Sequence, residues 1–596
     1  MSLTFTKGRT LRLALSDIVS SAFSECGYNA ELGLVTFSDR TDLCQFQCNG
    51  ALTGAKLHRK SPMAIATDVA ELLSKNEIFK SVSAAPPGFI NMTLTDEFIA
   101  SMTASMAADA RLGLPFAEKK RKIVIDYGGP NVAKPLHVGH LRTAIIGESL
   151  KRLAKFLGHE VIGDIHLGDW GLQMGLIISE LEREKPDLPY FDESFLGEYP
   201  AEAPVTLDDL SALYPQASIR SKEDEAFRAR AQRATFDLQN GRRGYVALWK
   251  RFLEISVSDL KKSYARLGVD FDVWLGESDA APYVDGLLKL LSDNGITYLS
   301  DGALIADVAR PDDDEPVPPV IISKSDGSQL YATTDLATLM QRMSDFDPDE
   351  IWYVVDSRQS MHFKQIFRLA KRAEIVKDST ELYHVGFGTM NGKDGKPYKT
   401  REGGVMSLSR LINMASDAAR EKIDASETSK ELSDAERAAI AETVGIAALK
   451  FGDLINHRTK DYIFDLDRFL ASEGKTGPYL QYTVVRISSL LAKAKESGMA
   501  PAKILPPSSD TERALMIKLF SVGDVLLRAH DDKAPSAVCE VMFDIAGLFN
   551  RFYFENKILS NDDAAQRDSW LSLMTLVRDI LVLLLNLLAT DVPPKM

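Results

Sequence analysis

Residues 122–150 read KIVIDYGGPNVAKPLHVGHLRTAIIGESL, and this stretch decides the fold of the chain. The apolar run at 123–127 predicts a buried strand, the Gly, Pro and Asn residues after it predict a loop, and a helix opens near His137. The residues that give this helix an apolar face are Leu141, Ile145, Leu153, Phe156 and Leu157. A strand–loop–helix unit points backbone N–H groups and the positive helix end at a ligand above the sheet edge, which suits a phosphate.

Two histidines occupy the first turn of the predicted helix. His137 and His140 are at i and i+3 and can place imidazole donors against phosphate oxygens, while Gly139 between them lets a flat ring such as adenine approach the backbone. An HxGH pattern alone is weak, because a chance pair of helix histidines gives the same letters. The surroundings make it specific, since PNxAKxxHVGHLR is followed by HLGDWG at 166–171.

Short apolar strands alternate with helices in the middle of the chain. The predicted strands are 123–127, 160–165, 351–356 and 382–387. This alternation predicts a Rossmann-type, doubly wound parallel sheet within a multidomain α/β protein. A long insertion at about 180–265 separates the second and third strands. Its acidic, proline-rich part at 186–215 predicts a loop, and the helix after it has an apolar stripe of Trp249, Phe252, Leu253, Leu260, Tyr264 and Leu267.

A length of 596 residues is too great for one hydrophobic core and predicts two to four domains, and the pattern along the chain divides it into three. Residues 1–118 mix short helices and strands and predict a small α+β domain that ends at the charged run 118–122. Residues 119–408 contain the parallel sheet. After about Leu408 the strands disappear, so residues 409–596 predict an all-α domain.

Composition and charge limit the class of protein. The chain is 45% apolar and 26% charged, as globular proteins are. Its N-terminus lacks the apolar core of a secretory signal, and its longest apolar stretch, 580–589, is too short to span a membrane and predicts a buried helix. Four cysteines without a Cys/His cluster predict free thiols in the cytoplasm and no metal site. The net charge of −14 argues against non-specific coating of nucleic acid but leaves a shaped partner open.

With these motifs in view, the chain resembles the class I aminoacyl-tRNA synthetases, and within them the arginyl-tRNA synthetases. HVGH at 137–140 stands where that class has its HIGH motif. Other matches follow in order along nearly the whole chain: QFQCNGAL (45–52), PPGFINM (86–92), GESD (276–279), LYATTDLA (330–337), VDSRQSMH (355–362), NGKDGKPYKTREGG (391–404), ALKFGDL (448–454) and DYIFDLDRFLASEGKTGPYLQY (461–482).

The resemblance implies a reaction in two steps. ATP and L-arginine form arginyl-adenylate and pyrophosphate, and the arginine then passes to the 3′-terminal ribose of tRNA(Arg). It implies Mg²⁺ with the ATP, a monomeric cytoplasmic enzyme, and no DNA or membrane partner. It also implies that the C-terminal helical domain binds the anticodon arm and that the N-terminal domain contacts the tRNA elbow.

The phosphate site follows from the same resemblance. His137 and His140 would contact the ATP phosphates, Gly139 would border the nucleotide, and Gly168 with Asp169 would lie beside the site, although these last two also fit a structural turn. The lysine-rich KMSKS loop of the class is absent in its usual form.

Positive charge for the leaving pyrophosphate must therefore come from other residues. GKPYKTREGG at 395–404 stands in place of the KMSKS loop and carries Lys396, Lys399 and Arg401, and Lys134 lies just upstream of HVGH. The resemblance implies that Lys134 compensates for the missing motif. How these four residues divide the task stays open.

Arginine selectivity is expected from carboxylates, because a planar guanidinium pairs with them bidentately. The resemblance gives this role to Glu277 and Asp335, with Tyr331 supplying a hydrogen bond or a ring face. Tyr331 and Asp335 are at i and i+4, which places both on one face of a helix; without the resemblance, Asp335 fits a helix cap. The residues implied for the α-amino end of the substrate are Asn131, Gln359 and Asp126.

The tRNA contacts also follow from the resemblance. Phe89 and Asn91 match positions that stack on and bond a D-loop base, and core packing is the alternative for Phe89. Tyr479, Tyr482 and Arg486 are at i, i+3 and i+7 on a helix that Pro478 would start. That face either contacts the anticodon arm or packs within the domain.

Three other functions share parts of this pattern: a small-molecule nucleotidyltransferase with an HxGH unit, a class I synthetase for another amino acid, and a catalytically silent tRNA-binding relative. Nucleotidyltransferases lack a helical domain of this length. The intact His137, His140, Lys134 and Asp335 argue against a silent relative. An exchange assay across amino acids, with and without tRNA, separates these functions.

Overall fold

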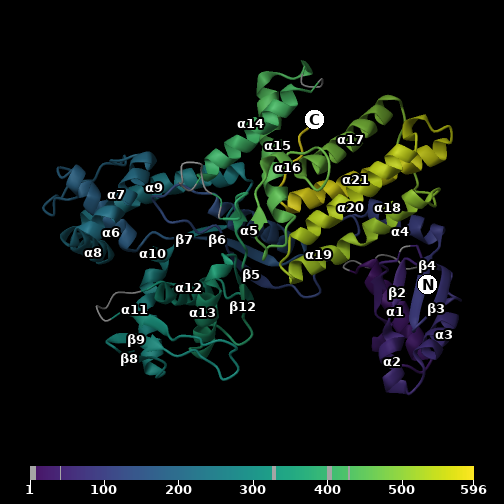
Figure 1. Ribbon diagram of the computed structural model, residues 1–596, viewed down its shortest axis with the longest axis horizontal. Helices are drawn as coiled ribbons and strands as arrows, with labels where there is room; N and C mark the ends of the chain where they lie inside the picture. Colours follow the sequence, from purple (N-terminus) through teal and green to yellow (C-terminus); the bar gives the residue numbers. More distant parts are fainter. Residues whose placement is uncertain (1–8, 41, 325–329, 397, 399–405, 427–429) are drawn as a thin grey trace.

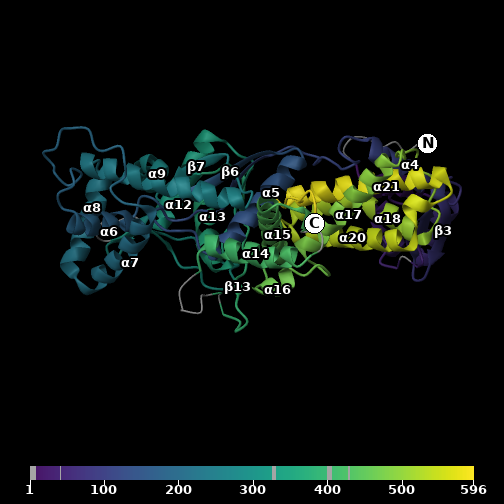
Figure 2. The same ribbon diagram turned by 90° about the horizontal axis from the view of Figure 1, so that it is seen from above.

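The computed structural model of the chain describes residues 9–40, 42–324, 330–396, 398, 406–426 and 430–596. A small N-terminal domain, an α/β domain and a helical C-terminal part follow one another along the sequence (Figure 1). The N-terminal domain and the helices inserted into the α/β domain lie at opposite ends of an elongated molecule (Figures 1 and 2). Lys399 and Arg401 lie outside the described residues.

A four-stranded antiparallel sheet, in the order β1-β2-β4-β3, forms the N-terminal domain. Its strands are β1 Val35–Phe37, β2 Phe46–Cys48, β3 Phe79–Ala85 and β4 Phe89–Leu94, and its helices are α1 Leu11–Glu25, α2 Gly50–His58 and α3 Pro62–Leu73, with a 3-10 turn η1 at Ala30–Gly33. In β4, Ile90, Met92 and Leu94 are buried and the residues between them are half-buried, which is the pattern of a strand with one face in the core. The predicted α+β class of this domain is confirmed.

A five-stranded parallel sheet, in the order β12-β11-β5-β6-β7, forms the centre of the α/β domain. Its strands are β5 Lys122–Asp126, β6 Glu160–Leu167, β7 Val273–Gly276, β11 Glu350–Tyr353 and β12 Glu381–His384. The four predicted strands are confirmed. The fifth, β7, was not predicted, because it is four residues long and lies at the edge of the sheet, where the apolar signal is short.

Both faces of this sheet are covered, as the doubly wound prediction requires. Ile123 and Ile125 of β5 belong to the core shared with α5 (Gly139–Phe156), while Val124 belongs to the core shared with α12 (Tyr331–Asp345) and α13 (Ser360–Arg372). The chain passes from β5 to β6 and β7 on one side and later to β11 and β12 on the other, so the topological switch point lies between β5 and β11. Sheets of this kind bind ligands at the carboxyl ends of the strands beside that point.

The inserted segment is mostly helical: α6 Leu172–Glu184, α7 Leu207–Glu223, α8 Glu225–Gln239 and α9 Arg243–Arg266. The predicted loop at 186–215 is therefore wrong in its last part, because α7 begins at Leu207 and contains Pro215. A capping box of Thr206 and Asp209 starts the helix, and buried Leu210 and Leu213 hold it although the proline lacks an N–H. The apolar stripe predicted for α9 is confirmed by buried Phe252, Leu260, Tyr264 and Leu267.

A smaller antiparallel sheet of β8 Tyr298–Ser300, β9 Ala303–Ala306 and β10 Val320–Ser323 follows α10 Glu277–Ala280, the 3-10 turn η2 Ala281–Tyr283 and α11 Val284–Asp293. Its buried residues join the core on the α12 and α13 side of the parallel sheet. This sheet therefore extends that layer of the α/β domain.

Helices dominate the chain after residue 408: α14 Leu408–Asp424, α15 Asp434–Leu454, α16 Leu466–Phe469, α17 Gly477–Glu496, α18 Asp510–Phe520, α19 Val522–Asp531, α20 Ser536–Glu555, the 3-10 turn η5 Ile558–Ser560 and α21 Ala564–Leu587. Pro478 lies in the first turn of α17, as predicted. The prediction that strands disappear here is wrong at one place, where β14 Tyr462–Ile463 pairs in parallel with β13 Met390–Asn391. This pairing attaches the helical part to the segment that precedes Lys399.

By length and composition alone, α21 is apolar enough to cross a membrane. In the structure it is a core helix that packs against α17, α20 and α4 (Asp96–Ala108), and Ile580, Leu581, Leu584 and Leu585 are buried there. Contacts within the protein account for its apolar surface, and the predicted buried helix at 580–589 is confirmed.

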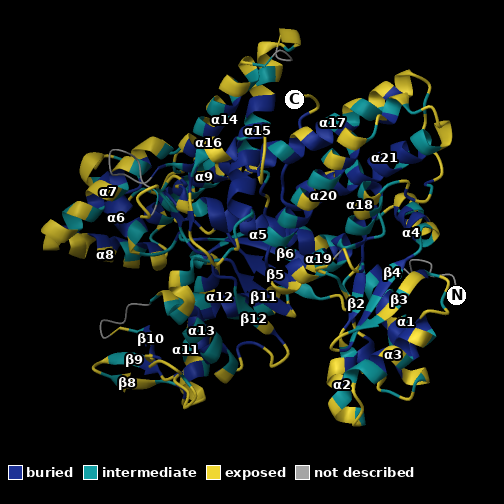
Figure 3. Cartoon of the chain, turned by 45° about the vertical axis from the view of Figure 1, so that its right-hand side comes forward, coloured by how far each residue is buried: buried dark blue, intermediate teal, exposed yellow. Residues whose placement is uncertain are grey.

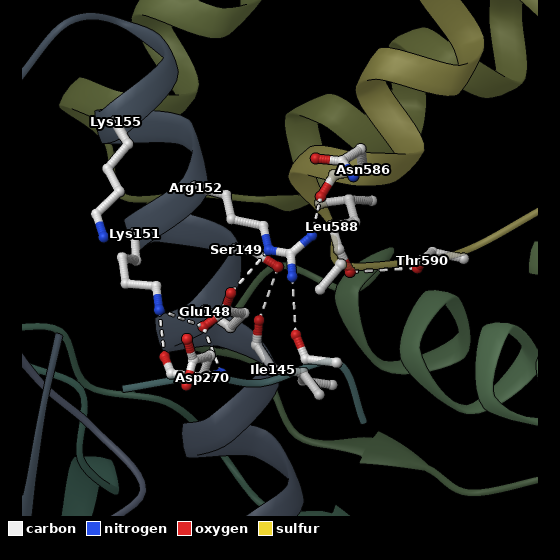
Figure 4. Close-up of polar contacts among 12 residues, drawn as sticks. Ile145, Glu148, Ser149, Lys151, Arg152, Lys155, Asp270, Asn586, Leu588 and Thr590 are labelled. Carbon is white, nitrogen blue, oxygen red and sulfur yellow. Dashed lines mark hydrogen bonds and ion pairs between the residues drawn. The ribbon is translucent and has the colours of Figure 1, made fainter. Parts of the chain in front are cut away.

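Helix α5, which carries the HVGH turn, lies at the buried centre of the molecule (Figure 3). Near its start, the buried Arg142 pairs with Asp453 of α15 at 3.0 Å. Near its end, Arg152 donates hydrogen bonds to the carbonyl oxygen of Asn586 (3.0 Å; Figure 4) and to that of Gly268 (2.9 Å). The position of the HVGH turn is therefore fixed by contacts with the helical part as well as with the sheet.

Candidate active site

The two histidines of the HVGH turn lie side by side, with ring centroids 3.9 Å apart. The backbone N–H of His137 donates to Nδ1 of His140, and the N–H of Gly139 donates to Nδ1 of His137, both at 3.1 Å. Because each Nδ1 accepts a hydrogen bond, each neutral ring carries its proton on Nε2. The turn therefore presents two Nε2–H donors, which is the arrangement that a phosphate needs.

Both imidazoles are held in the neutral form. Burial, followed by the charges of His137 and Lys134, lowers the pKa of His140 to about 3. Burial and the charge of Lys134 also lower the pKa of His137. These effects place the Lys134 ammonium close to both rings, so the predicted phosphate-binding residues are brought together.

Gly168 and Asp169 follow the carboxyl end of β6. Gly168 faces Asn131, and a Cβ at position 168 would lie 2.2 Å from Asn131 Oδ1, so a larger residue would displace the Asn131 side chain. Asp169 is buried and accepts hydrogen bonds from the backbone N–H (3.0 Å) and Oγ (2.6 Å) of Ser278. Its carboxylate therefore holds the turn on which Glu277 lies, and a contact of Asp169 with ATP stays a prediction.

Three carboxylates gather at the carboxyl edge of the sheet. Glu277 begins α10 directly after β7, and Asp335 lies in the second turn of α12. Burial first, and then the charges of Asp169 and Asp335, raise the pKa of Glu277 to about 7. Mutual repulsion of this kind is relieved by a bound cation, so the cluster fits a guanidinium.

The predicted helical spacing of Tyr331 and Asp335 is confirmed, since both lie on α12. Tyr331 is 74% exposed and lies near the acidic cluster, because burial and the charge of Glu277 are the main causes that raise its pKa. Asp335 Oδ2 is 2.5 Å from Nε2 of His362, a residue of α13. This contact fixes the orientation of the Asp335 carboxylate.

Asn131 and Gln359 lie after the carboxyl ends of adjacent strands. Asn131 is in the exposed loop after β5, and Gln359 ends the 3-10 turn η3 (Ser357–Gln359) after β11. Both positions border the switch point, where the main ligand of such a sheet binds. Their contact with the amino end of the substrate stays a prediction.

Asp126, the last residue of β5, has a partner within the protein. Its Oδ2 accepts a hydrogen bond from Nη2 of Arg342 (2.6 Å), and the same Nη2 lies 2.5 Å from Oδ2 of Asp164. Arg342 and Asp164 are fully buried. This ion triad joins α12 to β5 and β6, and a direct role of Asp126 in substrate binding stays a prediction.

We expect Arg342→Leu to lower the melting temperature of the protein by roughly 6–20 °C, because it leaves two carboxylates buried without their cation. Differential scanning calorimetry measures the change. Arg358→Leu is the matched control, since Arg358 pairs with Asp356 at 2.7 Å but is 77% exposed, and its loss should shift the melting temperature by about 3 °C or less. Equal shifts for the two variants would contradict a stabilising role of the triad.

The predicted tRNA-binding residues lie outside this edge. Phe89 is half-buried on β4, and Asn91 accepts a hydrogen bond from Gln47 Nε2 (2.9 Å). On α17, Arg486 donates to Asn550 Oδ1 (2.8 Å), and its guanidinium is 4.6 Å from the ring centroid of Tyr482.

The OH of Tyr479 accepts a hydrogen bond from Asn550 Nδ2 (2.9 Å). Tyr479 and Arg486 thus pack against α20, while Tyr482 is 41% exposed. Their contacts with tRNA stay predictions.

Two residues that the structure brings to the site were not predicted from the sequence. His362 stands inside the quoted motif VDSRQSMH, but nothing in that motif indicates contact with Asp335. Tyr214 lies on α7, in a segment predicted to be a loop, and its ring contacts Lys134. The capping box of α7 was the available signal for a helix there.

Comparisons with known proteins cover the whole architecture. The family model "tRNA synthetases class I (R), catalytic domain" matches residues 102–466. The models "Arginyl tRNA synthetase N terminal domain" and "DALR anticodon binding domain" match residues 10–94 and 480–596. Two curated relatives, each named arginine–tRNA ligase, are 52% identical (Alkaliphilus oremlandii) and 42% identical (Francisella tularensis), and each alignment covers 98% of this chain and 99% of the relative.

Solved structures share the fold. Arginyl-tRNA synthetase from Plasmodium falciparum superimposes with a TM-score of 0.81 at 24% identity, over 99% of this chain and all of that one. The enzyme from Thermus thermophilus gives 0.78 at 21% identity, over 98% of this chain and all of that one. The resemblance found in the sequence is confirmed: the chain belongs to the arginyl-tRNA synthetase family of class I aminoacyl-tRNA synthetases.

Proposed function

We propose that the carboxyl edge of the parallel sheet is where this arginine–tRNA ligase activates its amino acid. The ATP phosphates lie against the Nε2–H donors of His137 and His140, and the guanidinium of arginine lies between Glu277 and Asp335. Gly139, Gly168 and Asp169 border the nucleotide. The observation that carries the proposal is the cluster of three carboxylates, in which Asp169 and Asp335 raise the pKa of Glu277, together with the pair of neutral imidazoles.

The chemistry needs no protein nucleophile. The arginine carboxylate attacks the α-phosphorus of ATP, the bond to the bridging oxygen of the β-phosphate breaks, and pyrophosphate leaves. The 3′-terminal ribose hydroxyl of tRNA then attacks the adenylate carbonyl, and AMP leaves. Catalysis is therefore positioning together with stabilisation of charge on the phosphate oxygens.

Lys134, Lys399 and Arg401 supply positive charge to the pyrophosphate in this proposal. Mg²⁺ enters as part of the ATP substrate in this proposal, because it is commonly bound through substrate phosphates. Asn131 and Gln359, with Asp126 behind them, hold the amino end of arginine, and Tyr331 covers the guanidinium.

The tRNA-binding surface extends over the other two domains in this proposal. Phe89 and Asn91 contact the elbow of tRNA(Arg), and the face of α17 that carries Tyr479, Tyr482 and Arg486 contacts the anticodon arm. We further propose that the enzyme is a cytoplasmic monomer without a DNA or membrane partner. Light scattering after gel filtration measures the molar mass in solution and so tests whether the enzyme is a monomer.

Exchange of labelled pyrophosphate into ATP, measured across a panel of amino acids with and without tRNA, tests the site. Arginine should be the one amino acid of the panel that supports exchange. Exchange with another amino acid would contradict the arginine site, and exchange that Glu277→Gln and Asp335→Asn leave unchanged would place that site elsewhere.

We expect the KM for arginine to rise about tenfold as the pH falls from 8 to 6. Glu277 has a pKa raised to about 7, so it is mostly ionised at pH 8 and mostly protonated at pH 6. The guanidinium of arginine binds the ionised carboxylate of Glu277. Below pH 7 this carboxyl is mostly protonated and must lose its proton before arginine binds.

Steady-state kinetics at fixed ionic strength measure this profile. Glu277→Gln is the control, because it should raise the KM at pH 8 and remove most of the slope. A slope that persists in this variant would assign the pH dependence to another group and contradict the assignment to Glu277.

A further inference from the structure

Helix α7 of the insertion reaches the loop that precedes the HVGH turn. The ammonium of Lys134 lies 3.9 Å from the centroid of the Tyr214 ring, which is close enough for a cation–π contact. Tyr214 is also near Tyr331, since after burial and Glu277 it is among the groups that raise the pKa of the Tyr331 hydroxyl. One aromatic side chain of the insertion thus lies beside both halves of the active site.

Among the described residues, the Lys134 side chain has an aromatic partner and no acidic one. In the part of the chain that the structure describes, no carboxylate lies within ion-pair distance of its ammonium, although its charge lowers the pKa of both His137 and His140. A carboxylate partner would neutralise the charge that a pyrophosphate must meet. An aromatic ring holds an ammonium without neutralising it, and an incoming phosphate can displace that weaker contact.

The backbone at Lys134 is also held by the insertion. Ala133 has a φ of +64°, a left-handed conformation that a residue with a Cβ adopts at a cost, and its N–H donates to Oγ of Ser256 on α9 at 3.1 Å. Ser256 is buried. Helix α9 therefore fixes the backbone before Lys134, and α7 supplies the surface on which its side chain lies.

Tyr214 is itself supported from behind. It packs against a small core formed within the insertion by Leu176 of α6, Ala217 of α7, and Phe227 and Ala231 of α8. This core holds the ring without any contact from substrate. Because the protein's own packing holds the ring, the ring can preorganise the Lys134 side chain.

We propose that Tyr214 is a positioning residue of this synthetase, which uses the face of its ring to hold the Lys134 ammonium beside the HVGH histidines for transfer to the leaving pyrophosphate. The inference rests on the role proposed above for Lys134. It gives the insertion a part in amino acid activation, because without the ring the Lys134 side chain would no longer be held near the position of the phosphates. The hydroxyl of Tyr214 has no part in this role.

The first test is a set of variants in pyrophosphate exchange. Tyr214→Leu should lower kcat by about 5- to 30-fold with less than a twofold change in the KM for arginine, and Tyr214→Phe should remain within about twofold of the wild type. Lys134→Ala should lower kcat at least as far, and the double variant Lys134→Ala/Tyr214→Leu should lose no more than Lys134→Ala alone. Phe236→Leu is the matched control, since Arg233 lies 5.1 Å from its ring centroid on α8, outside the site, and exchange should not change.

The second test reads the position of Lys134 without catalysis. Limited acetylation followed by peptide mass spectrometry gives the reactivity of Lys134 relative to the exposed Lys222 of α7. Tyr214→Leu should raise this ratio several-fold, and Tyr214→Phe should leave it unchanged. Circular dichroism identifies any variant whose insertion has unfolded.

The two tests distinguish failure of the positioning role of Tyr214 from failure of the catalytic role of Lys134. An unchanged acetylation ratio in Tyr214→Leu, a loss in the Phe variant equal to that in the Leu variant, or losses that multiply in the double variant would each overturn the role of Tyr214. Full activity of Lys134→Ala would instead overturn the catalytic role of Lys134, while the acetylation ratio would still report whether Tyr214 holds it.

Discussion

Asp335→Asn should raise the KM for arginine by about 30- to 1000-fold while the KM for ATP changes less than threefold. Loss of one charge from a buried, hydrogen-bonded ion pair costs about 2–4 kcal/mol, which gives this range. The Asp335 carboxylate is already oriented by His362, at 2.5 Å, so an amide in its place would both lose the charge and disturb that contact. Arginine-dependent exchange in the presence of tRNA measures the effect.

Asp345→Asn is the matched control for this prediction. Asp345 is the last residue of the same helix, α12, and is exposed, so its substitution should leave both KM values unchanged. A normal KM for arginine with a lowered kcat in Asp335→Asn would remove Asp335 from the guanidinium site and leave it a structural role beside His362.

His140→Ala should lower the rate of adenylate formation by about 100- to 1000-fold, the usual cost of losing one preorganised donor to a developing charge. The two rings lie 3.9 Å apart, and Nε2–H of His140 is free to donate because its Nδ1 accepts from the backbone of His137. Its contact should strengthen on the pentavalent phosphorus, so kcat should change more than the KM for ATP. Single-turnover exchange measures this.

Binding of tRNA gives the internal comparison for His140→Ala. The dissociation constant for tRNA should stay within about twofold, because the histidine touches only the nucleotide in this proposal. His457→Ala, at an exposed histidine of the helical part, should change neither quantity. Equal losses of tRNA binding and adenylate formation in His140→Ala would show that the turn has collapsed and would contradict a specific role in catalysis.

The sequence by itself predicted those features whose signal is continuous along the chain. Four of the five strands in the parallel sheet follow from short apolar runs, and the HVGH turn follows from one strand–loop–helix stretch, because backbone periodicity and local motifs are encoded by neighbours. The family and the helical pair Tyr331–Asp335 come from the same kind of signal. The edge strand β7 and helix α7 were missed, since the first is short and the second contains Pro215.

Only the tertiary structure decided which side chains meet across the sheet edge. His362 reaches Asp335 from 27 residues away, Arg342 joins Asp126 and Asp164 across separations of 216 and 178 residues, and Tyr214 reaches Lys134 from the insertion. No local pattern encodes such pairs, because they depend on strand order and on how α7, α12 and α13 pack over the sheet. Contiguous motifs determine which residue types the site contains. The orientation of its charged groups depends on contacts between segments that become adjacent only after folding.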